Sequence, residues 1–186
     1  MRRTSRMFLL ILLIISVNNS IAQKIKFPAI GIGSGILFPQ NQWDTGYYFE
    51  LQSEVGEVMD YVFLIPYVSF WNAQKSETRF NTTVDLNMSH INFGSEMIGY
   101  LNPEAKGFFT GIGIGYHIIF ADKTAPQYFS QKPEVKEETE TKISFAGLLG
   151  YQLKFLNFSC ALKLKYYLIN GGYNTLQTGL IFSYNL

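Results

Sequence analysis

The sequence predicts an all-β protein, an eight-stranded antiparallel up-and-down transmembrane β-barrel. Three observations predict this fold: a strand pattern at the C-terminus, an export signal at the N-terminus, and connections that alternate in length. In segment 175–186 every second residue is apolar, which places Leu180, Phe182, Tyr184 and Leu186 on one face of a strand. Because an open strand edge invites aggregation, we expect this last strand to close a barrel.

Residues 1–22 have the pattern of a cleaved signal peptide. Three arginines lie within residues 1–6, an apolar run covers residues 7–15, and small residues precede Gln23. The apolar run is about half of the ~20 residues that a membrane-spanning helix needs. We therefore expect cleavage before Gln23 and one barrel domain over residues 23–186; a retained anchor helix is the alternative.

Charge and cysteine content exclude several classes of protein. The chain has 15 basic and 14 acidic residues, and removal of the leader would leave a slight excess of acidic ones. This balance gives no reason to expect a nucleic-acid partner. Cys160 is the one cysteine, so the chain cannot form an internal disulfide framework. We expect no cofactor and no bound metal.

After the leader, eight segments alternate apolar and polar residues. They are residues 28–38, 46–55, 59–71, 84–101, 107–121, 143–155, 158–169 and 175–186. Short connections are expected at 55–58, 102–106 and 156–157, and longer ones at 39–45, 72–83 and 122–142, with a brief link at 170–174. Short turns on one rim and longer loops on the other are typical of outer-membrane barrels.

The two faces of each predicted strand differ in chemistry. One face is apolar with aromatic residues towards its ends, as a lipid-facing surface requires, and the other carries glycine, serine, glutamine and lysine. The glycine runs at 31–35 and 111–115 continue as alternating strand, so they do not form nucleotide-binding loops. Trp43, Tyr47 and Trp71 are predicted to be interfacial anchors. Pro66 disagrees with its segment, because proline cannot donate to a strand ladder.

Charged residues recur on the faces predicted to point inward. Three carboxylates face three ammonium groups: Glu50, Glu54 and Glu96 against Lys154, Lys163 and Lys165. Because buried charges persist only when they are paired and hydrogen-bonded, we expect a structural network that plugs the lumen. A gated ion path and a pair of catalytic carboxylates are the functional alternatives.

A second inward-facing group is predicted near the rim that carries the longer loops. His90, His117 and Ser144 lie on three successive predicted strands. A Ser–His pair there could act as nucleophile and base, and two histidines could bind a metal. However, no carboxylate is placed to orient either histidine, and outer-membrane lipases tend to carry His and Ser two residues apart on one strand. We therefore expect no catalytic site.

The polar connection 122–142 is predicted to be a solvated loop, because it has mixed charge and no periodicity. Exposed loops are where a surface partner would bind. Tyr128 and Phe129 are the best candidates for such a contact.

The chain resembles a known family. It resembles the small outer-membrane β-barrel proteins of Gram-negative bacteria, the OmpA/OmpX-like eight-stranded barrels of the porin family. The resemblance rests on the leader ending at Ala22-Gln23, the glycine-rich first strand, residues 96–101 before a short turn, residues 107–115 after it, and the alternating terminus. The chain departs from the commonest pattern of this family by ending in Leu186 rather than in an aromatic residue.

The resemblance implies a location in the outer membrane. The expected partners are outer-membrane lipid, lipopolysaccharide, the barrel-assembly machinery and a surface or envelope protein. We expect a structural, surface-interaction or accessory role without catalysis, because a fold confers no single activity. The alternatives are a narrow passive channel for small solutes, a lipid-modifying hydrolase, and a soluble secreted barrel with an apolar interior.

Overall fold

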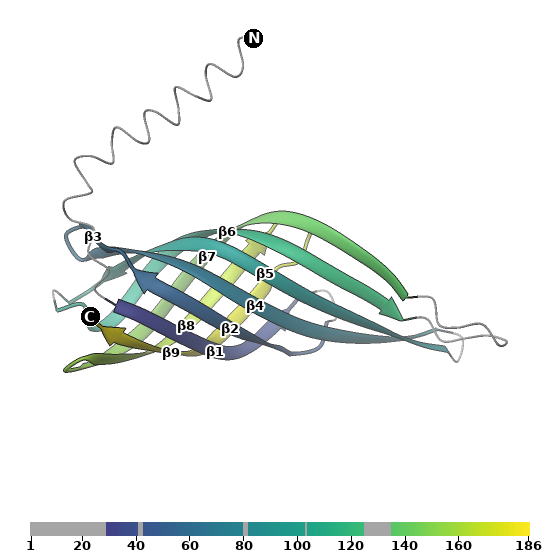
Figure 1. Cartoon of the computed structure of the whole chain (residues 1–186), viewed down its shortest axis with the longest axis horizontal. Coiled ribbons are helices and arrows are strands. Elements are labelled where there is room, and N and C mark those ends of the chain that lie inside the picture. Colours follow the sequence, from purple (N-terminus) through teal and green to yellow (C-terminus); the bar gives the residue numbers. More distant parts are fainter. Residues whose placement is uncertain (1–28, 41–42, 80–81, 103, 125–134) are drawn as a thin grey trace, which may run out of the picture.

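A computed structural model describes residues 29–40, 43–79, 82–102, 104–124 and 135–186. These residues form nine strands (Figure 1). The strands are β1 (Ala29–Pro39), β2 (Gly46–Glu54), β3 (Gly56–Met59), β4 (Val62–Arg79), β5 (Thr82–Tyr100), β6 (Gly107–Thr124), β7 (Val135–Phe155), β8 (Phe158–Ile169) and β9 (Thr175–Asn185). The predicted leader, residues 1–22, lies outside the described residues.

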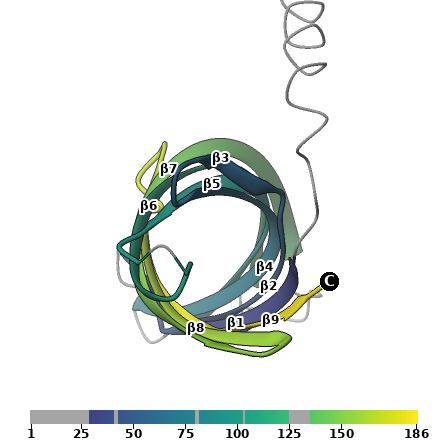
Figure 2. The ribbon, with the colours of Figure 1, turned by 90° about the vertical axis from the view of Figure 1, so that its left-hand side faces the viewer.

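The strands close into an antiparallel barrel with eight strand positions around its wall, which we call staves (Figure 2). Strands that follow one another in the chain pair with each other, except β2 and β3, which both pair with β4, and β1 also pairs with β9. The short β3 continues the stave that β2 begins, which accounts for nine strands in an eight-stave barrel. The predicted fold is confirmed, and the C-terminal strand closes the barrel along the full length of β1.

The join between β2 and β3 differs from the sequence prediction. The turn predicted at 55–58 was wrong: the amide of Val55 donates to the carbonyl oxygen of Leu64 at 2.9 Å, a normal length for a ladder bond, and pairing resumes at Gly56. Gly56 has a φ of 124°, which a residue with a side chain rarely adopts. The chain instead turns after Met59. Pro66 lies opposite the interruption, between Tyr67, which pairs with β2, and Leu64, which pairs with β3.

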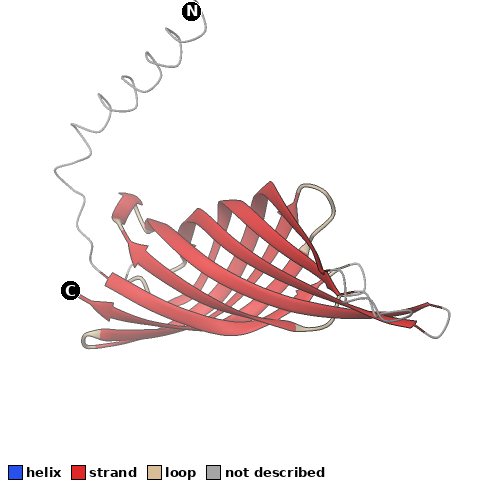
Figure 3. Ribbon diagram, turned by 45° about the vertical axis from the view of Figure 1, so that its right-hand side comes forward, coloured by secondary structure: helices blue, strands red, loops and turns tan. Residues whose placement is uncertain are grey.

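The connections predicted at 72–83 and 122–142 also differ, because most of their residues continue the strands. Their residues keep the ladder pairing, but the sequence there lacks the apolar alternation that marks a strand, because polar residues occupy most positions. We call these extensions the projecting sheet, which consists of residues 73–79 of β4, 82–88 of β5, 121–124 of β6 and 135–142 of β7. Figure 3 shows the two hairpins reaching beyond the other strands.

The barrel therefore has two unlike ends. The turns after β3, β5 and β7 lie at one end, which we call the short-turn rim, together with the C-terminus (Figure 1). The connections after β1, β4, β6 and β8 lie at the other end, the long-hairpin rim. This segregation was predicted, although the length on the second rim comes from paired strand rather than from loop.

The outer and inner faces have the polarity that the sequence predicts. Large apolar side chains cover the outside, such as Phe145 with 64% of its surface exposed and Leu162 with 55%. Glutamate, lysine, histidine and asparagine side chains are buried inside. Trp71 is an exception to the predictions: it was expected at the membrane interface, but its indole is buried in the lumen. No helix among the described residues is long and apolar enough to cross a bilayer.

Candidate functional site

The lumen is filled by side chains in successive layers, and the inward-facing residues of β5 give their order. From the short-turn rim, β5 places Tyr100 and Ile98 in an apolar layer, and then Glu96, Asn92 and His90 in three polar layers. The apolar layer completes a cluster with inward side chains of other strands: Ile65, Phe109, Leu148, Ala161 and Ile181. The candidate site is the polar stack above this cluster.

The first polar layer is an ion network at mid-height. The Nζ of Lys163 lies 2.5 Å from Oε1 of Glu50 and 3.2 Å from Oε2 of Glu96. The Nζ of Lys165 contacts Glu96 and lies 3.6 Å from Oε2 of Glu50. All four side chains are almost completely buried, so two ammonium groups balance two carboxylates in a medium where either charge alone would be costly.

Glycines beside these charged side chains make room for them in the narrow barrel. Lys163 is opposite Gly150 on β7 and Gly179 on β9, while Glu96 is opposite Gly113 on β6. A Cβ added at Gly150 would lie 2.4 Å from the carbonyl oxygen of Leu162, and one at Gly179 would lie 2.3 Å from the hydroxyl of Tyr48. The inward glycines that the sequence analysis identified therefore fit the close packing around the network.

An aromatic layer covers the network on the side of the long-hairpin rim. The Nζ of Lys165 lies 3.7 Å from the ring centroid of Tyr67 and 4.5 Å from that of Tyr167, close enough for cation–π attraction. The amide nitrogen of Asn92 donates to the hydroxyls of both tyrosines, at 3.2 and 3.3 Å. Sequence reasoning gave no role to Tyr67. The signal was weak because Pro66 obscures the strand that carries it.

The structure separates two of the six residues predicted for the network. Glu54 is half-buried and Lys154 is exposed, and both lie towards the short-turn rim, away from the four central charges. Their position follows from register, since each is the last or nearly the last inward residue of its strand. In their place, the amide oxygen of Gln52 accepts a hydrogen bond from Lys163 at 3.4 Å.

The next layer holds the predicted His–Ser cluster. Nε2 of His117 lies 2.8 Å from Oγ of Ser144, and the ring centroids of His117 and His90 are 5.8 Å apart. The indole of Trp71 stacks on His90 at 5.3 Å with an interplanar angle of 15°, and meets the edge of His117 at 4.9 Å. The three predicted residues are thus brought together, with Trp71 as an aromatic neighbour that the sequence analysis placed elsewhere.

This cluster lacks two features of a hydrolytic site. Ser144 and His117 have no exposed surface, so a lipid substrate has no path to the hydroxyl in this conformation. Nδ1 of His117 has no hydrogen-bond partner among the described residues, whereas a catalytic histidine is usually oriented by a carboxylate there. Within the described part of the chain, no group of three or more His, Cys, Asp or Glu side chains is arranged around a metal position.

The last layer is apolar and lies at the base of the projecting sheet. Ala73, Met88 and Ile119 pack together, and Trp43 and Tyr173 from two connections pack against them. At the opposite end of the polar stack, the apolar layer borders a cavity of about 20 Å³, room for about one water molecule. Both ends of the polar stack are therefore capped by tightly packed apolar side chains.

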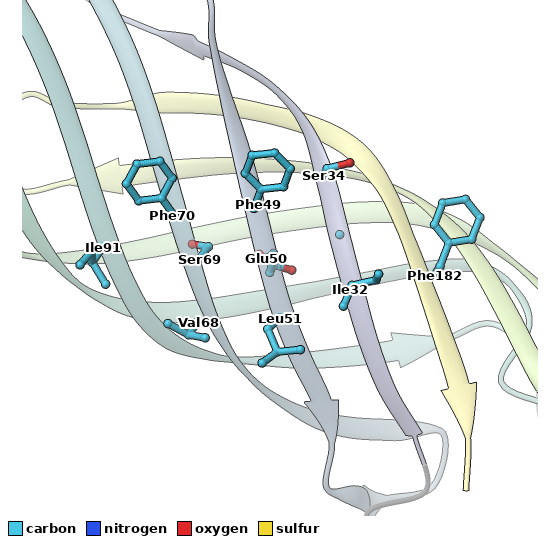
Figure 4. A pocket seen from close by; sticks show the side chains of 11 residues that line it. Ile32, Ser34, Phe49, Glu50, Leu51, Val68, Ser69, Phe70, Ile91 and Phe182 are labelled. Carbon is cyan, nitrogen blue, oxygen red and sulfur yellow. The ribbon is translucent and has the colours of Figure 1, made fainter.

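One hollow lies on the outside of the barrel rather than within it. It has a volume of about 650 Å³ and lies over β1, β2 and β4. Figure 4 shows Phe49 and Phe70 on neighbouring strands beside it, with Phe182 across β1. Because its wall is almost entirely apolar, this hollow belongs to the face that meets lipid hydrocarbon.

Tyr128 and Phe129, the predicted surface contacts, lie outside the described residues. The strand ends that carry their connection are nevertheless described, and these belong to the projecting sheet. Around them, exposed polar side chains such as Thr139, Glu140 and Thr141 face solvent.

No family model matches the chain. No curated protein matches it either.

Solved structures of small outer-membrane barrels do match the fold. Ail, the attachment invasion locus protein of Yersinia pestis, aligns with a TM-score of 0.50 at 15% identity over 84% of this chain and 94% of Ail. Neisserial surface protein A aligns with a TM-score of 0.50 at 9% identity over 85% and 95%. Ail in a phospholipid bilayer nanodisc aligns with a TM-score of 0.50 at 12% identity over 84% and 99%. The chain therefore has the eight-stranded barrel fold of these small outer-membrane proteins.

Proposed function

We propose that this chain is an integral outer-membrane protein whose plugged barrel holds the projecting sheet outside the cell for contact with a surface or envelope protein. The projecting sheet is the observation that carries the proposal. Four strands continue past the barrel wall as a paired sheet, although a barrel needs only short hairpins to close. In outer-membrane barrels the longer connections face the exterior, which orients the long-hairpin rim outward.

The outer surface of the barrel supports membrane insertion. An apolar band with aromatic side chains near both rims would face lipid and lipopolysaccharide, as in other barrels of this kind. A soluble barrel would expose these side chains to water at a large cost in free energy. One protein of the same fold, Ail, is known as a structure in a phospholipid nanodisc. Insertion would require the barrel-assembly machinery that serves such proteins.

The contents of the lumen favour a plug over a channel. The charges are paired with each other, and apolar layers lie on both sides of them. An ion crossing the barrel would have to break the Lys163–Glu50 and Lys165–Glu96 pairs and displace the aromatic caps. The burial of Ser144 and the missing carboxylate partner of His117 likewise favour a packing role over hydrolysis.

Membrane insertion and closure can be tested together. The protein should fractionate with the outer membrane and require detergent for extraction, and the folded barrel should give no unitary conductance steps in a planar bilayer. A Glu50→Ala, Lys163→Ala double variant removes one carboxylate and one ammonium group from the lumen. Its conductance serves as the control for the sensitivity of the bilayer measurement. Recovery of the wild type in the soluble fraction, or steady conductance steps from it, would contradict the proposal.

The surface role can be tested by crosslinking on intact cells. A photoreactive residue at Thr141, in the projecting sheet, should yield a discrete adduct with an envelope or surface protein. The same residue at Leu156, which is fully exposed in a turn of the short-turn rim, is the matched control. Equal adduct patterns from both positions, or adducts only from Leu156, would contradict a surface contact made by the projecting sheet.

A further inference from the structure

Two buried histidines face each other in the lumen on adjacent strands. His90 on β5 is opposite Ile119, and Asn92, two residues further on, is opposite His117 on β6. The two imidazoles are therefore diagonal neighbours on the inner face. Their centroids are 5.8 Å apart and their planes are nearly perpendicular, at 86°. This spacing allows one nitrogen of each ring to approach a common point between them.

The contacts around His117 are compatible with a proton on Nε2. Nε2 of His117 and Oγ of Ser144 are 2.8 Å apart, and the same Oγ lies 3.5 Å from the carbonyl oxygen of Gly115. In the tautomer in which Nε2 donates to Oγ, the hydroxyl hydrogen remains for the carbonyl of Gly115. A neutral imidazole protonated at Nε2 has a free lone pair at Nδ1. Metal-binding histidines commonly show this arrangement, in which the second ring nitrogen donates to a fixed acceptor.

The nitrogens that remain are buried without partners. Three ring nitrogens, both of His90 and Nδ1 of His117, have no hydrogen-bond partner among the described residues. At most 1% of either residue is exposed. Leaving such groups unsatisfied costs about 1–3 kcal/mol each. A small cation between the rings would use one lone pair from each histidine and remove part of this cost.

We propose that His90 and His117 form a binding site for a soft monovalent metal cation of the copper(I) class. Two neutral imidazoles suit such an ion, whereas a structural zinc site needs about four ligands and the described residues provide no group of three. Trp71 borders both rings, since its indole stacks on His90 and makes a T-shaped contact with His117. The thioether of Met88, buried two positions from His90 on the same face, is a further soft group in the adjoining layer.

The connection between β8 and β9 borders His90 on the side of the long-hairpin rim. Tyr173 in this connection lies over His90, with 6.3 Å between ring centroids, and it is only partly buried. Gly171 precedes it with a φ of 94°, so the segment has a backbone that other residues rarely adopt. The nearest cation at this rim, Lys142, lies opposite His117 and is paired with Glu140 at 3.0 Å.

The first test is direct binding of Ag(I), a redox-inert analogue of Cu(I), to the folded barrel in phospholipid nanodiscs. A Cys160→Ala background removes the one thiol, and Trp43→Phe leaves Trp71 as the one indole. We expect one equivalent of Ag(I) to quench the Trp71 fluorescence, because the indole stacks on His90. A Cu(I)-saturated chelator should then transfer one equivalent of Cu(I) to the protein. Absence of quenching at one equivalent, or of transfer, would overturn the proposal.

Variants then locate the ion. His90→Phe and His117→Phe should each weaken Ag(I) binding at least tenfold, and Ser144→Ala should weaken it about 10- to 100-fold by releasing the orientation of His117. Ser159→Ala is the matched control, since Ser159 is also a buried inward serine but lies near the short-turn rim. Binding that is equal in Ser144→Ala, Ser159→Ala and the parent would overturn the proposal even if a histidine variant failed to fold.

Discussion

The barrel and the projecting sheet are formed by the same strands but differ in the polarity of their side chains. Strand β5 runs through both: in the barrel its inner face carries Glu96, Asn92 and His90 against an outer face of Met97 and Phe93, whereas in residues 82–88 it pairs with polar strands on either side. The ladder of backbone hydrogen bonds continues without a change of register. The difference lies in the side chains: the barrel has an apolar outer face and a packed lumen, whereas the sequence of the projecting sheet is mostly polar and its described side chains include the exposed Thr139, Glu140 and Thr141.

This comparison indicates where a substitution should matter. In the barrel, each inward charge is balanced by another and each outward side chain must be apolar, so a single change leaves an uncompensated group. In the projecting sheet, exposed side chains such as those of Glu140 and Thr141 meet water, which screens charges and hydrates polar groups. We therefore expect sensitivity to fall from the lumen, through the lipid-facing surface, to the projecting sheet.

The largest effect is expected in the ion network. Lys165→Ala would leave Glu50 and Glu96 with one ammonium group between them in a buried site, and should lower the free energy of unfolding by about 3–5 kcal/mol. Denaturant titration of the barrel in detergent micelles measures this change. Lys154→Ala, at an exposed lysine towards the short-turn rim, is the control. Equal losses in the two variants would show that burial does not distinguish the network.

A charge placed in the lipid-facing surface should have the next largest effect. Leu162→Lys would put an ammonium group into the hydrocarbon at mid-depth and should destabilise the barrel by about 2–4 kcal/mol. Leu156→Lys introduces the same side chain in the turn between β7 and β8, where it meets water, and should change stability by less than about 1 kcal/mol. Unfolding titrations in lipid vesicles would separate the two, and similar values would argue against a membrane on this face.

The sequence was sufficient to predict the barrel because lipid imposes a strict alternation on every stave. The segment 158–169 was predicted with the bounds of β8, since its outward residues are large and mostly apolar and its inward ones, apart from Ile169, are polar, small or hydroxylated. The same signal disappears in residues 73–79 and 135–142, where polar residues predominate although the backbone pairing with β5 and β6 continues. The bulge at Val55 was missed for a different reason, because it shifts the phase of the alternation without a glycine or proline at the shifted residue itself.

The candidate site was predictable in its charges but not in its neighbours. Period-two counting places Lys163, Lys165, Glu50 and Glu96 on inner faces, and charge balance suggests that they pair. Counting does not give the relative heights of staves that are far apart in the chain, because the stagger of a barrel is set by its closure. For this reason Glu54 was grouped with the network, and Trp71 was expected at the interface although its neighbours in space are His90 and His117.

A smaller effect is expected from the glycines that surround the network. Gly150→Ala would bring a Cβ to within 2.3 Å of the ring of Phe109 and should cost about 1–3 kcal/mol through overpacking. Gly147→Ala, three residues away on the same strand, points to the lipid side, and nothing lies within 4 Å of its added Cβ. It should be neutral or slightly stabilising. A loss at Gly147 equal to that at Gly150 would mean that backbone flexibility, rather than space in the lumen, selects glycine.

The smallest effect is expected in the projecting sheet. Lys142 and Glu140 form an ion pair at 3.0 Å, but 26% and 44% of their side chains are exposed, so water screens the attraction. Lys142→Ala and Glu140→Ala should each change the free energy of unfolding by less than about 1 kcal/mol, and the double variant should show a coupling in the same range. A double-mutant cycle measured by denaturant titration at low salt, and repeated at high salt, tests this. A coupling above about 2 kcal/mol that survives high salt would place this pair in the same class as the lumen charges, and the contrast between the two regions would fail.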